Sequence, residues 1–342
     1  MNPEVNEYTE LCKAPALVAG ATGFVGSHTV RALLERGRKV RAMVRKTSDL
    51  SSITGLDVEI FYGDVSDQAS MEAAMRGCGT VFYSIVDARS WLSDPTVLFK
   101  TNVEGLRTAL AAAKNAGIKR LIFTSSMVTV GVKGKNGKPS DETVAFDWWD
   151  EASPYPRARV DAENILLDAC HKDDFPAISM CVANTYGPGD FLPTPHGGAL
   201  WEAAKGTLPA ALECSSPTVD IRDTADAMLR AEQYGRVGER YIVSNEFVSQ
   251  ERLYGLAATE LGKTPPKIMK MKTAYRMAAI NEFFSWILRR KDQRFCRSSI
   301  KLSEVFTELD NSKARQELGW APRAIEETVR DAVAWFSEHN RR

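Results

Sequence analysis

Short apolar runs alternate along the chain with longer stretches in which apolar residues recur every three or four positions. The apolar runs predict β-strands over residues 16–19, 39–44, 58–62, 81–86, 121–123 and 178–182. The stretches between them predict helices over residues 28–37, 67–76, 95–116 and 154–171. Strands that alternate with helices form a parallel sheet covered on both faces. The pattern therefore predicts an α/β protein with a doubly wound parallel sheet.

Glycine and proline become frequent from about residue 187, and the character of the chain changes there. Helical spacing continues over residues 198–205, 222–234, 250–262, 273–290 and 324–338. We expect a first part over residues 15–186 and a smaller, mostly helical C-terminal part over residues 187–342 that holds a substrate. Segments near 220–245 are expected to return to the sheet, and residues 1–14 to form a flexible N-terminal arm.

A glycine-rich turn connects the first strand to the first helix. In the spacing of Gly20, Gly23 and Gly26, the first glycine reverses the chain and the second lets backbone N–H groups approach a pyrophosphate. The third lets the helix pack against the strand. The turn predicts a Rossmann-type dinucleotide site made of Gly20, Thr22, Gly23, Phe24, Val25 and Gly26. A plain glycine-rich turn is the alternative.

The end of the second strand bears on which dinucleotide binds. An acidic residue there, about 20 residues after the glycines, selects NAD(H). This chain has Arg45 and Lys46 instead, which favour the 2′-phosphate of NADP(H). A solvated basic edge is the alternative. Asp64 ends the third strand, where it is placed to accept from the adenine amino group, although it equally suits a turn. The remaining expected cofactor contacts are Val65, Ile85 and Asn102.

Ser126 and Tyr155 are the candidate catalytic hydroxyls. Ser126 closes the fifth strand, and Tyr155 lies in the first turn of a helix for which Ser153 is the predicted N-cap. Tyrosine has an ordinary pKa of about 10. It needs a cation such as Arg159, one turn further on, and the positive helix end to exchange protons near neutral pH. Ser126 would bond the substrate oxygen as charge develops there. An exposed tyrosine and a strand-end serine without chemical roles are the alternative.

Several other stretches complete a recognisable set. They are residues 101–105, 124–126, 153–155, 162–163, 186–190, 311–314 and 317–320. With the glycine turn and Asp64 they resemble an extended short-chain dehydrogenase/reductase of the NAD-dependent epimerase/dehydratase superfamily, over residues 14–338. Residues 91–95, 191–198 and 238–242 resemble its dihydroflavonol-reductase-like and 3β-hydroxysteroid-dehydrogenase-like branch. The resemblance implies that Ser126 binds the substrate oxygen, that Tyr155 is the general acid–base, and that residue 159 also holds the nicotinamide ribose.

The chain departs from this family at three places, and the first two concern the catalytic cation and the cofactor groove. The family has lysine four residues after the tyrosine, whereas this chain has Arg159, whose guanidinium supplies charge but does not deprotonate. The fourth strand ends in Tyr83-Ser84-Ile85-Val86 where the family has a histidine and small residues, which would narrow the cofactor groove. We therefore weigh a retuned reductase against a non-catalytic, regulatory NADP(H)-binding protein.

A third departure concerns the substrate. Asn184 begins a stretch that resembles the Asn-x-Tyr-Gly-Pro-Gly of sugar-nucleotide epimerases, so a nucleotide-sugar epimerase or dehydratase is an alternative. Arg222 is a candidate phosphate ligand, although Asp220 and Asp223 are close enough in sequence to pair with it. Weaker candidates for substrate contact are Ser126, Asn184, Trp149 and His196.

Apolar residues at helical spacing within residues 273–290 precede the basic run Arg289–Lys291. They are Met277, Ile280, Phe283, Phe284, Ile287 and Leu288. This face would line a pocket for a lipid or steroid, rest on a membrane surface, or pack in the core, which is the simplest interpretation. Trp148 and Trp149 are likewise either a lid over an apolar ligand or core residues.

Composition removes several classes of function. Lysine plus arginine equals aspartate plus glutamate at 44 each, so no basic field is available to hold a nucleic acid. The six cysteines lack metal-like spacing, so we expect reduced thiols and no metal. No apolar run is long enough for a transmembrane helix, and we expect a cytoplasmic protein. The family resemblance implies a homodimer through the helices at 95–116 and 154–171.

These observations predict an NADP(H)-dependent oxidoreductase that interconverts a secondary alcohol and a ketone. We expect its substrate to be a mostly apolar small molecule of steroid, isoprenoid or flavonoid type. The hydride chemistry would belong to the nicotinamide.

Overall fold

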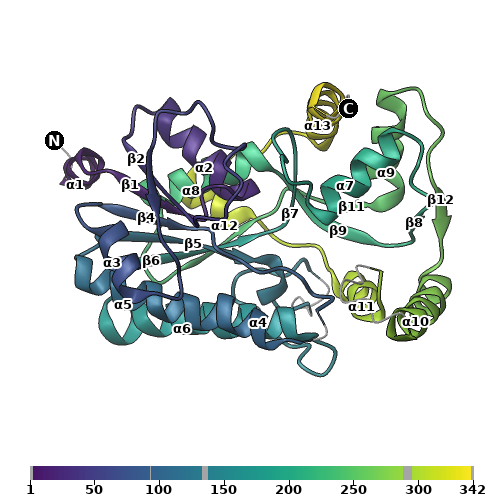
Figure 1. Ribbon diagram of the computed structural model, residues 1–342, viewed down its shortest axis with the longest axis horizontal. Coiled ribbons are helices and arrows are strands. Elements are labelled where there is room, and N and C mark those ends of the chain that lie inside the picture. Colours follow the sequence, from purple (N-terminus) through teal and green to yellow (C-terminus); the bar gives the residue numbers. More distant parts are fainter. Residues whose placement is uncertain (1–2, 93, 133–137, 288–294, 340–342) are drawn as a thin grey trace.

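Seven parallel strands form the central sheet of the structure, a computed structural model that describes residues 3–92, 94–132, 138–287 and 295–339 (Figure 1). Their order is β10-β6-β5-β4-β1-β2-β3, and every neighbouring pair is parallel. The strands are β1 (Ala16–Ala19), β2 (Val40–Val44), β3 (Glu59–Tyr62), β4 (Thr80–Tyr83), β5 (Arg120–Ser126), β6 (Ala177–Val182) and β10 (Arg240–Val243). The predicted α/β class and doubly wound sheet are confirmed.

Helices cover both faces of this sheet (Figure 1). One face carries α2 (Phe24–Glu35), α8 (Ile221–Tyr234) and α12 (Ser312–Leu318); the other carries α3 (Gln68–Met75), α5 (Gly105–Ala116) and α6 (Pro154–Asp173). Strand β10 comes from the region near 220–245 and pairs with β6, so the chain returns to the first sheet after entering the second part. The carboxyl ends of the strands, where ligands bind in such sheets, therefore form one edge.

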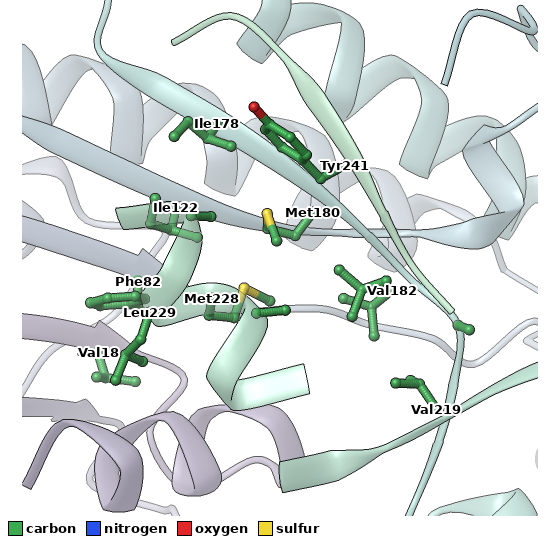
Figure 2. Close-up of a cluster of buried hydrophobic side chains, with 14 of the residues drawn as sticks. Val18, Phe82, Ile122, Ile178, Met180, Val182, Val219, Met228, Leu229 and Tyr241 are labelled. Carbon is green, nitrogen blue, oxygen red and sulfur yellow. The ribbon is translucent and has the colours of Figure 1, made fainter. Parts of the chain in front are cut away.

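Alternating residues of the inner strands, such as β1 and β2, fill two separate cores. In β1, Val18 belongs to the core under α2 and α8, whereas its neighbour Leu17 belongs to the core under α3, α5 and α6. Figure 2 shows the first core, which also contains Ile122 of β5 and Met228 and Leu229 of α8. Because both faces are buried, the strands read as continuous apolar runs in the sequence.

The second part is built around two small sheets that the sequence does not predict. One has the order β11-β9-β7 and the other pairs β12 with β8. Their strands are β7 (Asn184–Tyr186), β8 (Ala210–Leu212), β9 (Ser215–Asp220), β11 (Glu246–Ser249) and β12 (Lys267–Met269). The helices of this part are α7 (Pro195–Ala204), α9 (Gln250–Glu260), α10 (Met271–Ile287), α11 (Arg297–Val305) and α13 (Ile325–His339). Helix therefore predominates, as expected.

Two segments differ from the sequence-based expectation. The arm expected to be flexible contains helix α1 (Pro3–Lys13), from which the Tyr8 hydroxyl contacts Glu232 of α8 at 3.4 Å. The single helix predicted over 95–116 is divided into α4 (Thr96–Phe99), the π-helix η1 (Lys100–Glu104) and α5. Contacts with residues distant in sequence order α1 and distort the predicted helix at η1. Such contacts leave no signal in the local periodicity of the sequence.

No helix within the described residues is long and apolar enough to cross a membrane. No group of three or more His, Cys, Asp or Glu side chains gathers there to hold a metal ion. All six cysteines are free thiols. Ser93 and the basic run Arg289–Lys291, which the sequence analysis singles out, lie outside the described residues.

Candidate functional site

The backbone around the glycine turn leaves no room for a Cβ atom at Gly20 or Gly26. Gly20 follows β1 with a φ of +83°, and a Cβ there would lie 2.8 Å from the Ser84 carbonyl oxygen. A Cβ on Gly26 would lie only 2.1 Å from the Gly20 carbonyl oxygen. Helix α2 begins at Phe24 with Gly23 as its N-cap residue, and no side chain caps its first N–H groups. These N–H groups, at the positive helix end, suit an anion.

The rest of the turn is held from behind. The Ser52 hydroxyl donates to the Thr22 carbonyl oxygen at 3.0 Å, and Arg31 donates to the Ser52 carbonyl oxygen at 2.6 Å. The Val25 side chain is half-buried against the core under α2. The turn is thus fixed by groups that a bound dinucleotide would not displace.

Two exposed cations follow β2. Arg41, inside the strand, pairs with Glu59 at 2.9 Å, whereas Arg45 and Lys46 form no ion pair with another described residue. Nearby, the Asp64 carboxylate accepts from the N–H and hydroxyl of Ser66 at 2.8 and 2.7 Å. These bonds, more than the charge of Arg45, lower the pKa of Asp64. Asp64 thus builds the turn that the sequence offers as an alternative.

Ser126 and Tyr155 come from β5 and α6, which pack against each other. Ser126 is the last residue of β5, and its hydroxyl accepts from the Val128 N–H at 3.4 Å, at the start of the 3-10 helix η2 (Met127–Thr129). Tyr155 is the second residue of α6 and is 9% exposed. No other described residue forms a hydrogen bond with its hydroxyl. Ser126 therefore lies at the carboxyl end of β5, and α6, the helix that carries Tyr155, packs against β5 and η2.

Arg159 lies one turn beyond Tyr155 and is 1% exposed. One Nη donates to the Thr124 carbonyl oxygen at 2.5 Å and the other to Asn102 Oδ1 at 3.3 Å. The guanidinium lies over the Phe123 ring, 5.0 Å from its centroid. Its Nε has no partner among the described residues. Each Nη thus makes one hydrogen bond to the protein itself, whereas Nε makes none to a described residue.

Asn102 extends this network to the segment after β4. Its Oδ1 accepts from the Asp87 N–H at 3.1 Å and its Nδ2 donates to the Asp87 carbonyl oxygen at 2.9 Å. Asp87 in turn pairs with Arg89 at 2.5 Å. Asn102 sits in the π-helix, where the wider turn brings its amide to both Asp87 and Arg159. The side chain is buried, so its contacts are with protein.

The end of β4 lies against the end of β5. The Ser84 hydroxyl bonds the Thr124 hydroxyl at 2.8 Å. The Tyr83 hydroxyl is buried without a partner among the described residues, and burial raises the pKa of Tyr83. Ile85 and Val65 are half-buried and pack against the core under α3 and α5. These side chains border the strand ends next to the glycine turn.

A cavity of about 380 Å³ lies between the start of α6 and helices α10 and α11. It is lined by Trp148, Glu151, Ser153, Pro154, Tyr275, Glu282, Arg297, Ser298, Lys301 and Leu302. Ser153 takes the N-cap position of α6 but makes no cap bond; of the two positions from which it could accept, Tyr155 and Pro156, the proline has no N–H. The Ser153 hydroxyl and the Trp148 Nε1 are both buried without a partner among the described residues.

The two tryptophans before α6 therefore have different environments. Trp148 is a core residue that also forms part of the cavity wall. Trp149 is 44% exposed and meets the Phe146 ring edge-to-face. The core alternative from the sequence therefore holds for Trp148 but not for Trp149.

The remaining substrate candidates lie in the second part. Asn184 is half-buried at the start of β7. His196 donates from Nε2 to the Thr185 carbonyl oxygen at 2.8 Å, and burial lowers the pKa of His196 to about 4. This ring is accordingly neutral near pH 7 and supports the small sheet.

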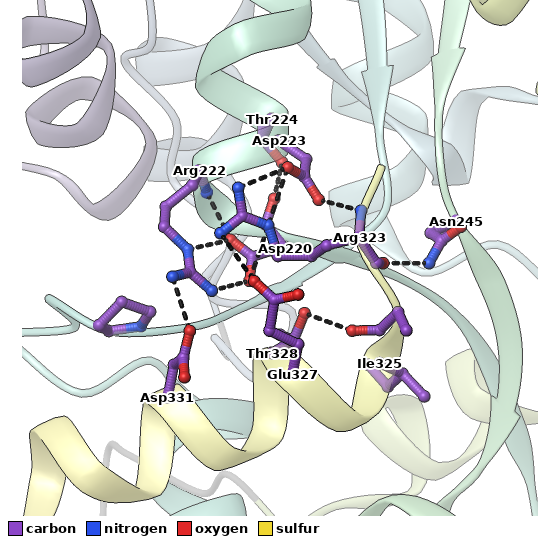
Figure 3. A network of polar contacts seen from close by, with 12 residues as sticks. Asp220, Arg222, Asp223, Thr224, Asn245, Arg323, Ile325, Glu327, Thr328 and Asp331 are labelled. Atoms are coloured by element: carbon purple, nitrogen blue, oxygen red, sulfur yellow. Dashed lines mark hydrogen bonds and ion pairs between the residues drawn. The ribbon is translucent and has the colours of Figure 1, made fainter. Parts of the chain in front are cut away.

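Arg222 is committed to ion pairs (Figure 3). It bonds both carboxylate oxygens of Asp220, the closer at 2.7 Å, and Asp331 of α13 at 2.7 Å. Arg323 pairs with the neighbouring Asp223 at 3.0 Å. The salt-bridge alternative for Arg222 is therefore correct, and the network joins α8 to α13.

Sequence reasoning missed Thr124 and Asp87, because both act through backbone atoms. The Thr124 carbonyl oxygen and the Asp87 backbone amide carry no signal in a side-chain pattern. Only the position of Thr124 in the stretch 124–126, next to Ser126, could have drawn attention to it.

Comparison with known proteins identifies the family. The model of the NAD dependent epimerase/dehydratase family matches residues 16–244. The chain belongs to this family. A candidate dihydroflavonol 4-reductase of Synechocystis sp. is 31% identical, with 98% of each chain covered. Sterol demethylase protein B of Methylococcus capsulatus is 32% identical, covering 94% of this chain and 98% of that protein. The crystal structure of gox2253 has a TM-score of 0.84 and is 34% identical, and the match covers 96% of this chain and 99% of that one.

The resemblance stated from the sequence is thereby confirmed. The chain is an NAD(P)-dependent enzyme of the short-chain dehydrogenase/reductase type, acting on a CH–OH or carbonyl group. The retuned-reductase interpretation is thus favoured over a non-catalytic one. The glycine turn, with its excluded Cβ positions and uncapped helix start, fits the nicotinamide dinucleotide that this family binds.

The Gly26 contact predicts the effect of one methyl group. Gly26→Ala would place a Cβ against the Gly20 carbonyl oxygen and displace the turn. We expect at least about 10-fold weaker NADPH and NADH binding by fluorescence titration. Gly255→Ala in α9 is the matched control, since nothing lies within 4 Å of the added Cβ. Wild-type affinity in Gly26→Ala would contradict the assignment of the turn.

His196 predicts a pH dependence of stability. Its pKa is lowered from 6.5 to about 4 in the folded protein, so unfolding takes up a proton between these values. Stability from this group is therefore lost as pH falls from 6.5 towards 4. We expect His196→Gln, which keeps a donor for Thr185, to reduce the slope of the unfolding free energy by up to about 1.4 kcal/mol per pH unit. Urea unfolding at several pH values measures it, and an unchanged slope would show that His196 titrates normally.

Proposed function

We propose that this chain is an NADP(H)-dependent oxidoreductase that interconverts a secondary alcohol and a ketone on a mostly apolar small molecule. The position of Tyr155 carries the proposal. It lies in the first turn of α6, directly after two residues that line the cavity, and its hydroxyl is not engaged by another described residue. The full-length similarity to a candidate dihydroflavonol 4-reductase and to a sterol demethylase protein supports an apolar substrate.

The residues around the glycine turn would hold the cofactor. The first N–H groups of α2 would bind the pyrophosphate, and Arg45 and Lys46 would bind the 2′-phosphate of NADP(H). The Asp64 carboxylate, already fixed by Ser66, would face the adenine. When bound, the nicotinamide supplies or accepts a hydride at the substrate carbon.

Tyr155 would move the proton at the substrate oxygen. In the reducing direction the carbonyl carbon gains the hydride and the oxygen gains the Tyr155 proton, so that C=O becomes CH–OH. Ser126 would donate a hydrogen bond to the same oxygen as negative charge develops. Arg159 would act as a fixed positive charge that stabilises the phenolate left behind. Its Nη groups are bonded to Thr124 and Asn102, and a guanidinium does not deprotonate, so it does not relay the proton.

The cavity wall, which combines apolar side chains with four charged ones, supports a mostly apolar substrate that carries a few polar groups. Trp148, Pro154 and Leu302 supply apolar surface. The Trp148 Nε1 and the Ser153 hydroxyl have no partner among the described residues, and a polar group of the ligand would supply a partner to each of them. The epimerase alternative is weaker, because Arg222, the cation singled out for a sugar diphosphate, is neutralised by two carboxylates.

Tyr155→Phe tests the proton transfer. Removing the hydroxyl while keeping the ring should lower kcat for reduction of steroid, isoprenoid or flavonoid ketones by at least about 100-fold, since general acid catalysis contributes 10²- to 10⁴-fold. The Kd for NADPH should not change. Tyr234→Phe, an exposed tyrosine at the end of α8, is the matched control. Retained turnover in Tyr155→Phe, or a wild type that reduces no ketone of the panel, would overturn the proposal.

The cofactor preference rests on two side chains. The double variant Arg45→Ser/Lys46→Ser should weaken NADPH binding by about 10- to 100-fold, because charge-assisted bonds to the 2′-phosphate are lost, and should leave NADH binding almost unchanged. Arg76→Ser, an exposed arginine following α3, controls for loss of positive charge. Equal effects on the two cofactors would mean that Arg45 and Lys46 form only a solvated edge.

A further inference from the structure

Helix α10 buries its small residues and exposes its large ones. Ala274 and Ala278 are fully buried and pack with Ile300 of α11, and Ser285 is 3% exposed. The large apolar side chains point outward: Tyr275 is 40% exposed, Met277 45%, Ile280 57%, Phe283 57% and Phe284 55%. The core-packing interpretation from the sequence is therefore wrong for Met277, Ile280, Phe283 and Phe284.

These outward residues form one surface, which we call the α10 face: Met277, Ile280, Phe283 and Phe284. Their spacing of three, four and seven residues places them on one side of the helix. Figure 1 shows α10 at the outer edge of the second part, away from the central sheet. Exposed apolar residues gathered in this way mark an interaction site in a folded protein.

Basic residues accompany the α10 face. Exposed lysines and one arginine lie just before and within α10: Lys263, Lys267, Lys270, Lys272 and Arg276. None of them forms an ion pair with another described residue. Over residues 261–284 the one acidic residue is Glu282, and it is paired with Arg297 at 2.6 Å. The surface around α10 therefore combines aromatic and aliphatic side chains with five cations that form no ion pair with another described residue, and the exposed Glu213 and Glu260 are the acidic residues near them.

This combination identifies the partner. A second copy of the chain would place five cations opposite five cations across a shared interface, which is unfavourable. An anionic lipid surface supplies both an apolar layer for Phe283 and Phe284 and negative charge for the lysines. We propose that the α10 face binds the surface of an anionic lipid bilayer.

The position of the cavity gives this binding a purpose. Tyr275 and Glu282 of α10 form one wall of the cavity, and Ser153 and Pro154, next to Tyr155, form another. A bilayer held against the α10 face would therefore lie on another side of the helix that forms this cavity wall, close to the cavity that borders Ser153 and Pro154. This second step, entry of the substrate from the bilayer, rests on the proposed function, whereas lipid binding does not.

Vesicle co-sedimentation tests the lipid surface. We expect the wild type to bind vesicles of equal parts phosphatidylglycerol and phosphatidylcholine, and to bind pure phosphatidylcholine at least 10-fold less. Phe283→Ser/Phe284→Ser and Lys267→Gln/Lys270→Gln/Lys272→Gln should each weaken binding to the anionic vesicles at least 10-fold. Both variants change exposed side chains, so thermal unfolding should be unaffected. Tyr234→Ser/Val237→Ser, two exposed apolar residues after α8, is the matched control.

Three outcomes would overturn the lipid proposal. The wild type does not bind anionic vesicles, or the α10 variants bind them as well as the wild type does. In the third outcome, the protein does not bind vesicles, and size-exclusion chromatography shows a dimer that Phe283→Ser/Phe284→Ser converts to a monomer. The partner of the α10 face is then a second copy of the chain.

Substrate entry is tested with the same variant, which should reduce a vesicle-dissolved ketone more slowly than the wild type does, but a water-dissolved ketone equally fast. Equal rates on both would overturn entry alone, and no turnover by any form would overturn the proposed function while leaving the vesicle result valid.

Discussion

The buried guanidinium of Arg159 is the interaction on which the geometry of the candidate site depends. One cation bonds the Thr124 carbonyl oxygen in β5 and the Asn102 amide in η1, and Asn102 holds the backbone of Asp87 after β4. Three segments far apart in sequence are thereby fixed around the first turn of α6. A lysine ammonium lacks the planar fork and the flat surface that rests on the Phe123 ring. Arginine at this position thus serves the architecture of the site as well as its charge.

Local sequence was sufficient for the central sheet and the glycine turn. The inner strands of the sheet are buried on both faces, and Gly20 and Gly26 are each required by a nearby backbone atom, so periodicity and spacing carry the information. The π-helix was not predictable in this way. It exists where Asn102 reaches Asp87 and Arg159, and those contacts span 15 and 57 residues. Helix α1 was missed for the same reason, since Tyr8 contacts Glu232 across 224 residues.

The residue types of the candidate site were predictable from the sequence, but the hydrogen-bond and ion-pair partners of these residues were not. The sequence placed Arg159 behind Tyr155, yet could not show that Thr124 and Asn102 occupy both Nη groups. It offered Arg222 either as a phosphate ligand or as a partner of Asp220, and Asp331, 109 residues away, contributes to the outcome. A charged side chain seen in sequence is a potential ligand until its protein partners are known. Burial therefore decides between chemical and structural roles.

Burial also explains why α10 can bind a partner, because the fold leaves much of its apolar surface exposed. Its helical period was visible in the sequence, but which side faces the protein depends on α11, where Ala274 and Ala278 pack with Ile300. Burial of apolar surface stabilises by about 25 cal/mol per Å². The fold does not use this contribution from Phe283, Phe284 and Ile280, because each stays more than half exposed. It remains available to a bilayer, and the neighbouring lysines confine that use to anionic surfaces.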